Sequence, residues 1–315
     1  MDTKAPQVVE KPKPSGRRRW PRILLTVLAV FVTLLGVAIG AVYAVSSKHM
    51  TQIWDVKPVA YSVPEGAEVI ARGKAVAIFR GCADCHGLDL SGKVFLDEMP
   101  VMRLVAANLT QGGLAATYTD EDWARAVRHG IAPSGRPLLF MPSYEWIELS
   151  NEDLGALVAY IRSLPAVAQV DHGQSAVGPL GRILYLTGEL PLLAAELIDH
   201  GLQPARPVPA ASAEYGKYLI TGCTGCHGEG LSGGKIPGVP PSWPIAPNLT
   251  PHASGLASWS EADFINTLRS GKTPGGQELR ADFMPWEFIS QSSDEDLTAL
   301  WLYLTSLPPR PAGNR

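Results

Sequence analysis

Residues 82–86 read Cys-Ala-Asp-Cys-His, and residues 223–227 repeat this pattern as Cys-Thr-Gly-Cys-His. The two stretches contain all four cysteines of the 315-residue chain. From the composition, one Cys-x-x-Cys-His sequence arises by chance with a probability of roughly 0.001. Two copies that use every cysteine therefore predict a pair of equivalent sites around which the chain folds.

The sequence around these stretches is also repeated, at spacings of 140 to 143 residues. Residues 108–110 and 248–250 both read Asn-Leu-Thr, and residues 140–142 and 283–285 both read Phe-Met-Pro. Motifs that keep their order while their spacing changes slightly indicate a duplicated domain. We expect one domain over residues 64–165 and a second over residues 212–308, joined by residues 166–211.

Both repeats have the pattern of short helices separated by Gly- and Pro-rich loops. A Ser or Thr stands three residues before an Asp at two predicted helix starts in each repeat, which is typical of N-terminal caps. The last predicted helix of each repeat carries an apolar stripe and stops at Pro165 or Pro308. Strand signals are weak, so we predict an all-α fold of two tandem helical domains. The cap pairs are Thr119/Asp122, Ser150/Asp153, Ser260/Asp263 and Ser293/Asp296.

An uncharged segment, residues 23–45, precedes the two repeats. As a helix it would rise about 34 Å, enough to cross a bilayer. Residues 1–22 hold seven basic and two acidic side chains, which predicts a disordered cytoplasmic tail. A signal peptide cleaved near residues 42–44 is the alternative, but its apolar region is usually shorter. We predict one uncleaved anchor in the cell inner membrane, with the remainder of the chain on the periplasmic side.

The Cys-x-x-Cys-His sequence is typical of covalent haem attachment. Two cysteines one helical turn apart can bond the vinyl groups of one haem, and the adjacent histidine can then ligate the iron. A redox disulfide would need a βαβ context, and a zinc site would need a second cysteine pair or both copies together. We therefore predict two haem c groups. The candidate attachment residues are Cys82, Cys85, Cys223 and Cys226, and the candidate axial ligands are His86 and His227.

The matched Phe-Met-Pro sequences supply a candidate for the second axial ligand. Met284 is the single methionine of the second repeat, and Met141 is its counterpart in the first. A methionine on an apolar loop usually fills a core, but that role does not explain the matched positions. Thioether ligation raises the reduction potential of haem and closes the iron to substrate, which favours electron transfer over catalysis.

Two arginines precede the candidate methionines. Arg136 and Arg280 stand five and four residues before them and are candidate contacts for haem propionates. The alternative for each is a solvated surface arginine.

Each repeat resembles a class I cytochrome c in these motifs, and the whole chain resembles the membrane-anchored dihaem cytochromes c of bacteria. The resemblance covers about residues 64–165 and 212–308. It implies that the first and last helices of each domain cross, with Gly73 near Tyr160 and Gly216 near Tyr303. One departure is that the first repeat has two more residues than the second between its Gly-Lys pair and its first cysteine.

The resemblance implies electron transfer between a redox donor and a redox acceptor. The chain would act as a shuttle or as the cytochrome subunit of a respiratory or dehydrogenase complex. A dihaem redox enzyme, peroxidase-like or thiosulfate dehydrogenase-like, is the alternative, but it would need an open iron or an unusual ligand. A third interpretation is that the haems only stabilise the fold.

The rest of the sequence limits the kinds of partner that the chain can have. Beyond residue 22 the chain carries 20 basic and 28 acidic side chains, which argues against nucleic-acid binding. Residues 180–202 are apolar, but a proline and charges interrupt them, so they are not a second span. We expect a short helix there that covers an interdomain surface or contacts a partner.

Overall fold

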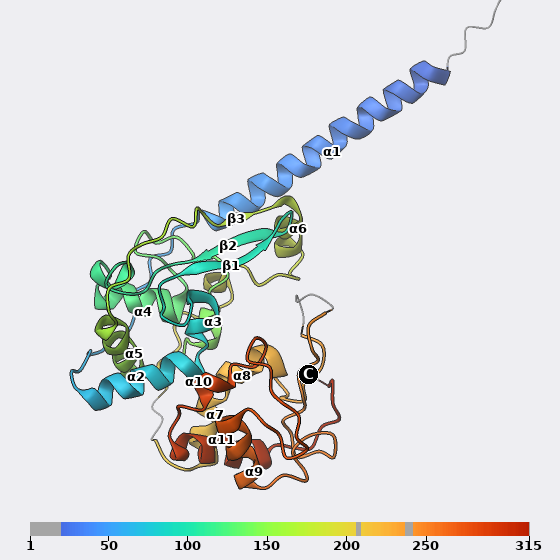
Figure 1. The fold of residues 1–315 in the computed structure, drawn as a ribbon. Helices are drawn as coiled ribbons and strands as arrows, with labels where there is room; N and C mark the ends of the chain where they lie inside the picture. Colours follow the sequence, from blue (N-terminus) through green and yellow to red (C-terminus); the bar gives the residue numbers. More distant parts are fainter. Residues whose placement is uncertain (1–19, 206–208, 237–241, 315) are drawn as a thin grey trace, which may run out of the picture.

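The computed structural model describes residues 20–205, 209–236 and 242–314 (Figure 1). The predicted basic tail lies outside these residues, apart from residues 20–22. A long helix, α1, projects from a body of two lobes. Helices dominate both lobes, which confirms the predicted helical fold. They are α1 (Trp20–Met50), α2 (Ala67–Phe79), α3 (Cys82–His86), α4 (Asp120–His129), α5 (Asn151–Ser163), α6 (Pro179–Leu186), α7 (Ala213–Leu219), α8 (Thr221–His227), α9 (Glu261–Ser270), α10 (Trp286–Ile289) and α11 (Asp294–Ser306).

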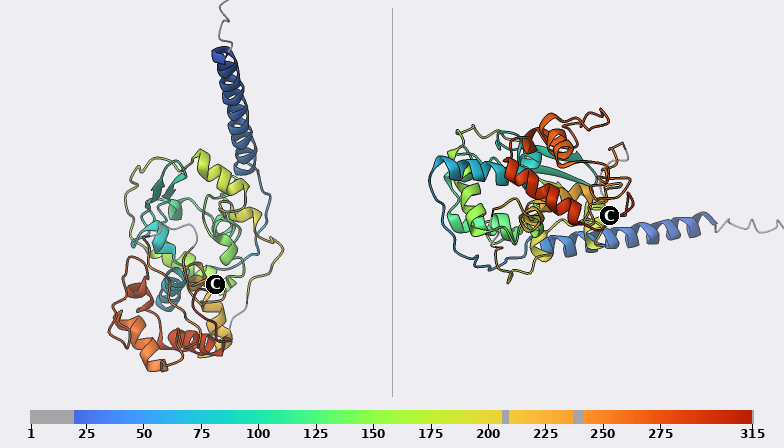
Figure 2. Two further views of the ribbon diagram at one scale, coloured as in Figure 1. Left: turned by 90° about the vertical axis from the view of Figure 1, so that its right-hand side faces the viewer. Right: turned by 90° about the horizontal axis from the view of Figure 1, so that it is seen from below.

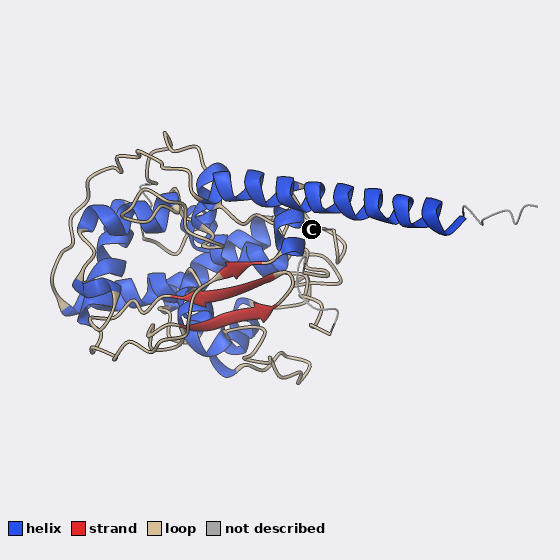
Figure 3. Ribbon diagram, turned by 90° about the horizontal axis from the view of Figure 1, so that it is seen from above, coloured by secondary structure: helices blue, strands red, loops and turns tan. Residues whose placement is uncertain are grey.

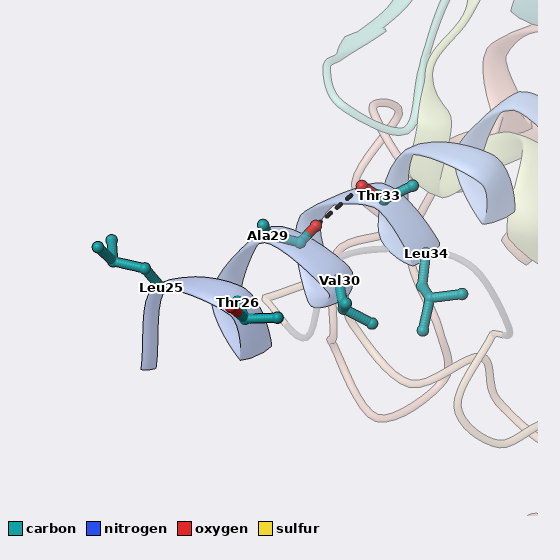
Figure 4. Close-up of a pocket in the computed structure, with 6 residues that line it drawn as sticks. All are labelled: Leu25, Thr26, Ala29, Val30, Thr33 and Leu34. Carbon is teal, nitrogen blue, oxygen red and sulfur yellow. Dashed lines mark hydrogen bonds between the residues drawn. The ribbon is translucent and has the colours of Figure 1, made fainter. Parts of the chain in front are cut away.

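Helix α1 is longer than the predicted span at both ends. Of the helices described, it is the one that is long and apolar enough to cross a membrane, and its apolar window is fully exposed. The hydroxyl of Thr33 donates to the carbonyl of Ala29 over 2.8 Å, which satisfies a polar group that lipid cannot (Figure 4). The shallow hollow drawn in Figure 4 is lined by residues of α1 alone. Helix α1 thus fits a single-pass membrane anchor.

In each domain the first helix crosses the last, as the resemblance implied. A Cβ atom built on Gly73 of α2 would lie 1.9 Å from the carbonyl oxygen of Ala156 in α5 and 2.7 Å from the Cβ of Tyr160. Only glycine permits so close an approach of two helices. The matching contacts in the second domain, between α7 and α11, join Gly216 to Ala299 and Tyr303.

The four predicted helix caps are all present. At the start of α4, for example, the Thr119 hydroxyl accepts a hydrogen bond from the backbone of Asp122, whose carboxylate accepts one in return from the backbone of Thr119. Ser260 and Ser293 cap α9 and α11 in the same reciprocal way, and at α5 the Ser150 hydroxyl accepts from the backbone of Asp153 without a return bond. These caps fix where the helices that surround each site begin.

A three-stranded antiparallel sheet was not predicted from the sequence. Strands β1 (Lys93–Glu98) and β2 (Met102–Ala106) form a hairpin in the first domain, and β3 (Ala176–Val177) pairs with β2 (Figure 3). Met102 and Leu104 on β2 are buried with Val177 in a small core of their own. The third strand comes from the segment between the repeats, about 70 residues further along the chain. Such pairing at a distance leaves little local pattern in the sequence.

The segment between the repeats contains the expected short helix, α6, but that helix does not cover an interdomain surface. Arg182 of α6 instead contacts the end of α1 through Ser46 and Ser47. The region that follows packs in the core beneath the sheet, through Leu192 and Leu193. The segment therefore ties the first domain to the anchor.

Candidate functional site

The Cys-x-x-Cys-His sequences form the short helices α3 and α8, one in each domain. Cys82 and Met141 pack against the same hydrophobic core in the first domain. Cys223 and Met284 do the same in the second domain. In both domains the fold therefore brings the attachment helix and the methionine loop to one core, although 55 or more residues separate them in sequence.

Each candidate histidine is held by a backbone carbonyl. The Nδ1 atom of His86 lies 2.8 Å from the carbonyl oxygen of Ala107, and Nδ1 of His227 lies 2.9 Å from that of Pro247. When Nδ1 donates to the carbonyl, Nε2 is the atom that can ligate a metal. Burial lowers the pKa of His86, which favours the neutral ring that ligation requires.

The Asn-Leu-Thr turns hold these carbonyls in place, because Asn108 and Asn248 directly follow them. The Oδ1 atom of Asn108 accepts hydrogen bonds from the backbone N–H and the hydroxyl of Thr110, over 2.9 and 2.7 Å. Asn248 accepts the same pair from Thr250, over 2.9 and 2.8 Å. Both asparagines are buried, and their amides donate to the segment after the last helix of their domain. The two turns therefore position the histidine rings through the carbonyls that their Nδ1 atoms contact.

The second domain contains a cavity of about 480 Å³ that Cys226, His227 and Met284 all line. The buried hydroxyl of Thr267, which also lines it, has no hydrogen-bond partner among the described residues. The rest of the lining is mainly apolar and aromatic, and it includes Leu249, Leu256, Trp259, Phe264, Leu268 and Phe283. A histidine, a thioether and a largely apolar wall suit a haem group.

The two candidate arginines lie in different surroundings. Arg280 lines the cavity, and its guanidinium carbon lies 4.2 Å from the ring centroid of Phe283. Its carbonyl accepts a hydrogen bond from the backbone of Met284 over 2.9 Å. Arg136 is exposed on the turn that joins Ile131 to Pro137, and among the described residues its side chain makes no contact with the first site. The geometry therefore favours Arg280 alone.

The alternative of a zinc site shared by both cysteine pairs finds no support. Within residues 20–205, 209–236 and 242–314, no three His, Cys, Asp or Glu side chains are placed to hold one metal ion. The two pairs belong to two separate cores.

Both attachment helices contact the end of α2. A Cβ atom built on Gly222, at the start of α8, would lie only 1.5 Å from the carbonyl oxygen of Phe79. Phe79 is buried in the core of the second domain, and Tyr218 of α7 packs against the core of the first. Each domain thus contributes an aromatic side chain to the other, and the two sites are neighbours across a packed interface.

Arg80 lies at this interface and was missed by sequence reasoning. It is 7% exposed, its guanidinium lies 5.0 Å from the ring centroid of Tyr218, and it donates to the Tyr218 carbonyl over 3.3 Å. Burial raises the pKa of Cys82 and of Cys223 to about 12, and the charge of Arg80 opposes this rise at both thiols. One cation therefore acts on both sites. The first repeat has two more residues than the second between its Gly-Lys pair and its first cysteine, and Arg80 lies in that longer segment. This difference was the signal in the sequence.

Comparison with known proteins identifies these two domains. The family model for cytochrome c matches residues 70–165 and again residues 213–308. The chain belongs to the cytochrome c family. It contains two cytochrome c domains, and its cofactor is haem c, one group in each domain. The predicted cofactor and the predicted electron-transfer class are thereby confirmed.

Relatives of this cytochrome c are cytochrome subunits of dehydrogenases by name. The alcohol dehydrogenase (quinone) cytochrome c subunit of Gluconobacter oxydans (strain 621H) is 28% identical over 277 residues, covering 78% of this chain and 56% of the relative. The gluconate 2-dehydrogenase cytochrome c subunit of Pantoea cypripedii is 27% identical, covering 78% and 60%. The fructose dehydrogenase cytochrome subunit of Gluconobacter japonicus is 29% identical, covering 76% and 53%. The chain spans little more than half the length of these relatives.

Proposed function

We propose that this cytochrome c is the membrane-anchored electron-transfer subunit of a dehydrogenase complex. It accepts electrons from a dehydrogenase subunit and delivers them to a second redox partner. The anchor crosses the cell inner membrane, and both cytochrome domains, over residues 64–165 and 212–308, lie on the periplasmic side. The basic residues before α1 support this orientation, and the relatives' names support the type of complex.

The side chains of the two sites have separate tasks in this proposal. Haem c supplies a one-electron iron couple when bound. The cysteine pairs would attach it covalently, and the histidines, whose rings the Asn-Leu-Thr turns position, would ligate its iron together with the methionine sulfurs. Arg280, which lines the cavity of the second domain, would hold a haem propionate there. The proposed attachment residues are Cys82, Cys85, Cys223 and Cys226, and the proposed iron ligands are His86, Met141, His227 and Met284.

The observation that carries the electron-transfer proposal is the contact between α8 and the end of α2. Gly222 and Phe79 touch backbone to backbone, and both attachment helices begin within three residues of that contact. Packed protein therefore fills the space between the two cysteine pairs at this point. Such a junction favours passage of electrons between the domains, which an enzyme with one isolated reactive haem does not need.

Substrate-linked reduction tests the proposed complex. The full chain, matured with haem, is isolated in mild detergent from its own membranes, and any dehydrogenase subunit that accompanies it is identified by mass spectrometry. Adding the substrate of that subunit should reduce both haems to completion. Carbon monoxide added to the reduced protein should leave both spectra unchanged, because methionine closes each iron.

Two results would count against the proposal. If no dehydrogenase accompanies the chain, or if its substrate leaves the haems oxidised, the assignment to a dehydrogenase complex fails. Ready binding of carbon monoxide by one haem would support the dihaem enzyme instead.

A further inference from the structure

Helix α6 exposes apolar side chains on one of its faces. Leu180, Ile183 and Leu186 are 42%, 45% and 38% exposed, and their spacing of three residues places them on one face of the helix. Gly181, on the opposite face, is buried, and Tyr185 packs against the core beneath the sheet. This is the reverse of an ordinary surface helix, which buries its apolar stripe and exposes its polar one.

Helix α6 is fixed beside the last turns of α1. The guanidinium of Arg182 lies 4.3 Å from the ring centroid of Tyr43, and it donates to the hydroxyls of Ser46 and Ser47 over 2.6 and 3.0 Å. In the left view of Figure 2, the yellow-green ribbon of α6 lies at the end of the body from which α1 projects. The charged side chain of α6 thus faces the protein while its apolar side chains face away.

A second set of contacts prevents α6 from rolling about its axis. The Tyr185 hydroxyl donates to the carboxylate of Glu196 over 2.5 Å, and the other oxygen of that carboxylate lies 2.6 Å from Nδ1 of His49 in α1. Helix α6 is therefore held to the end of the anchor from two positions. The outward direction of its apolar face is a property of the fold.

The position of α6 along the anchor decides what covers this face. The predicted apolar span of α1, residues 23–45, ends just before Ser46, and its rise of about 34 Å slightly exceeds the hydrocarbon core of about 30 Å. Tyr43 and the serines that follow therefore lie in the headgroup layer, where aromatic and cationic side chains are favoured. Arg182 contacts these residues, so α6 lies at the same depth.

We propose that α6 is a second membrane contact, whose face of Leu180, Ile183 and Leu186 inserts into the interfacial layer of the bilayer that α1 spans. An uncharged helix face at this depth continues the lipid-facing surface of the anchor. Two attachments, one through the membrane and one on its surface, fix the tilt of both cytochrome domains. The surfaces left open to redox partners are fixed with them.

Photo-crosslinking from α6 tests this contact. A benzophenone amino acid replaces Ile183 in the full-length, haem-loaded protein, which is placed in nanodiscs of phosphatidylcholine and phosphatidylglycerol. The matched control carries the same amino acid in place of Leu302, a 36% exposed leucine of α11, at the far end of the body from α1 (Figure 1). Replacement of Val30, in the exposed apolar part of α1, gives the yield expected for full lipid contact.

After irradiation, mass spectrometry measures the fraction of protein that carries a lipid adduct. We expect a yield from position 183 within about threefold of that from position 30, and at least fivefold above that from position 302. Equal yields from positions 183 and 302 would overturn the proposal. Crosslinking from position 183 to a protein subunit, but not to lipid, in native membranes would also overturn it.

Discussion

The hydroxyl of Tyr218, in the second cytochrome domain, donates a 2.5 Å hydrogen bond to the carboxylate of Asp153 in the first. Asp153 is buried at the start of α5, and Arg72 donates to its other oxygen over 2.7 Å. The backbone N–H of Ser150 in turn donates to the Tyr218 hydroxyl over 3.2 Å. The two domains are thus joined by a buried polar network as well as by the aromatic contacts around α8.

Removing the Tyr218 hydroxyl should weaken this junction. In Tyr218→Phe, Asp153 loses one charge-assisted donor while the ring stays in place, so we expect a loss of about 1.5–3 kcal/mol in the free energy of unfolding. Denaturant unfolding of the haem-loaded chain measures it. Tyr303→Phe is the matched control, because the Tyr303 hydroxyl has no hydrogen-bond partner in the described part of the chain. Equal losses in the two variants would show that the interdomain bond contributes nothing.

Neutralising Arg80 should lower both reduction potentials together. A buried cation near an iron disfavours its oxidised, more positive state, and a unit charge at roughly 10 Å in an effective dielectric of 20 contributes about 1.7 kcal/mol. In Arg80→Gln we therefore expect each potential to fall by tens of millivolts in a spectroelectrochemical titration. Arg80→Lys should keep most of the shift, and Arg136→Gln should change neither potential. A fall at one haem alone would contradict the shared position of Arg80.

Each asparagine turn should affect only its own histidine. Asn248→Ala removes the acceptor for two Thr250 donors. The Thr250 hydroxyl still has the Arg310 carbonyl as an acceptor, but the buried backbone N–H is left unpaired, at a cost of about 1–3 kcal/mol. The Pro247 carbonyl that orients His227 then loses its support. We expect altered hyperfine-shifted proton signals of the second haem in the NMR spectrum, with those of the first unchanged. Asn108→Ala should give the reverse result. If either variant disturbed both haems equally, the effect would be general loosening of the fold.

A buried histidine, His129, beside the half-buried His200 predicts acid sensitivity. The Nδ1 atoms of His129 and His200 lie 3.0 Å apart, and the ring of His200 stacks edge-on against Trp54, with centroids 5.2 Å apart. Burial, together with His200 and Arg128, lowers the pKa of His129 to about 4. The folded state therefore resists a proton that the unfolded chain accepts below about pH 6.5. The free energy of unfolding therefore has its full value above that pH and decreases as the pH falls toward 4.

The loss over this range should reach about 2–3 kcal/mol, since 1 pKa unit corresponds to about 1.4 kcal/mol. Urea unfolding at several pH values measures it. In His129→Gln the free energy of unfolding should vary less between pH 4 and 6.5 than in the parent chain. An unchanged slope in this variant would assign the acid sensitivity to other groups.

Local patterns predicted most of the fold and most of the site. Caps such as Ser150 with Asp153 act over three residues, and the attachment motifs act over five, so the sequence displays them directly. The crossing at Gly73 and Tyr160 came from the resemblance to cytochromes c. The repeat then transferred each feature of one domain to the other, which is how Met141 was chosen over the other methionines.

What the sequence did not show depends on contacts between distant segments. Strand β3 joins β2 across about 70 residues, and the outward face of α6 follows from where Arg182 is bound. Arg80 has no counterpart in the second repeat, so the repeat could not reveal it. Its importance comes from Gly222 and Tyr218, which reach it from the other domain.

Intact-mass measurement tests the central claim most directly, namely that each chain carries two haem groups bonded through Cys82, Cys85, Cys223 and Cys226. The full-length protein is matured in a host that attaches c-type haem and is weighed under denaturing conditions. We predict the mass of the chain plus two haems, and plus one haem when Cys223 and Cys226 are both replaced by alanine. A chain that leaves the same host with no covalently bound haem would contradict the account.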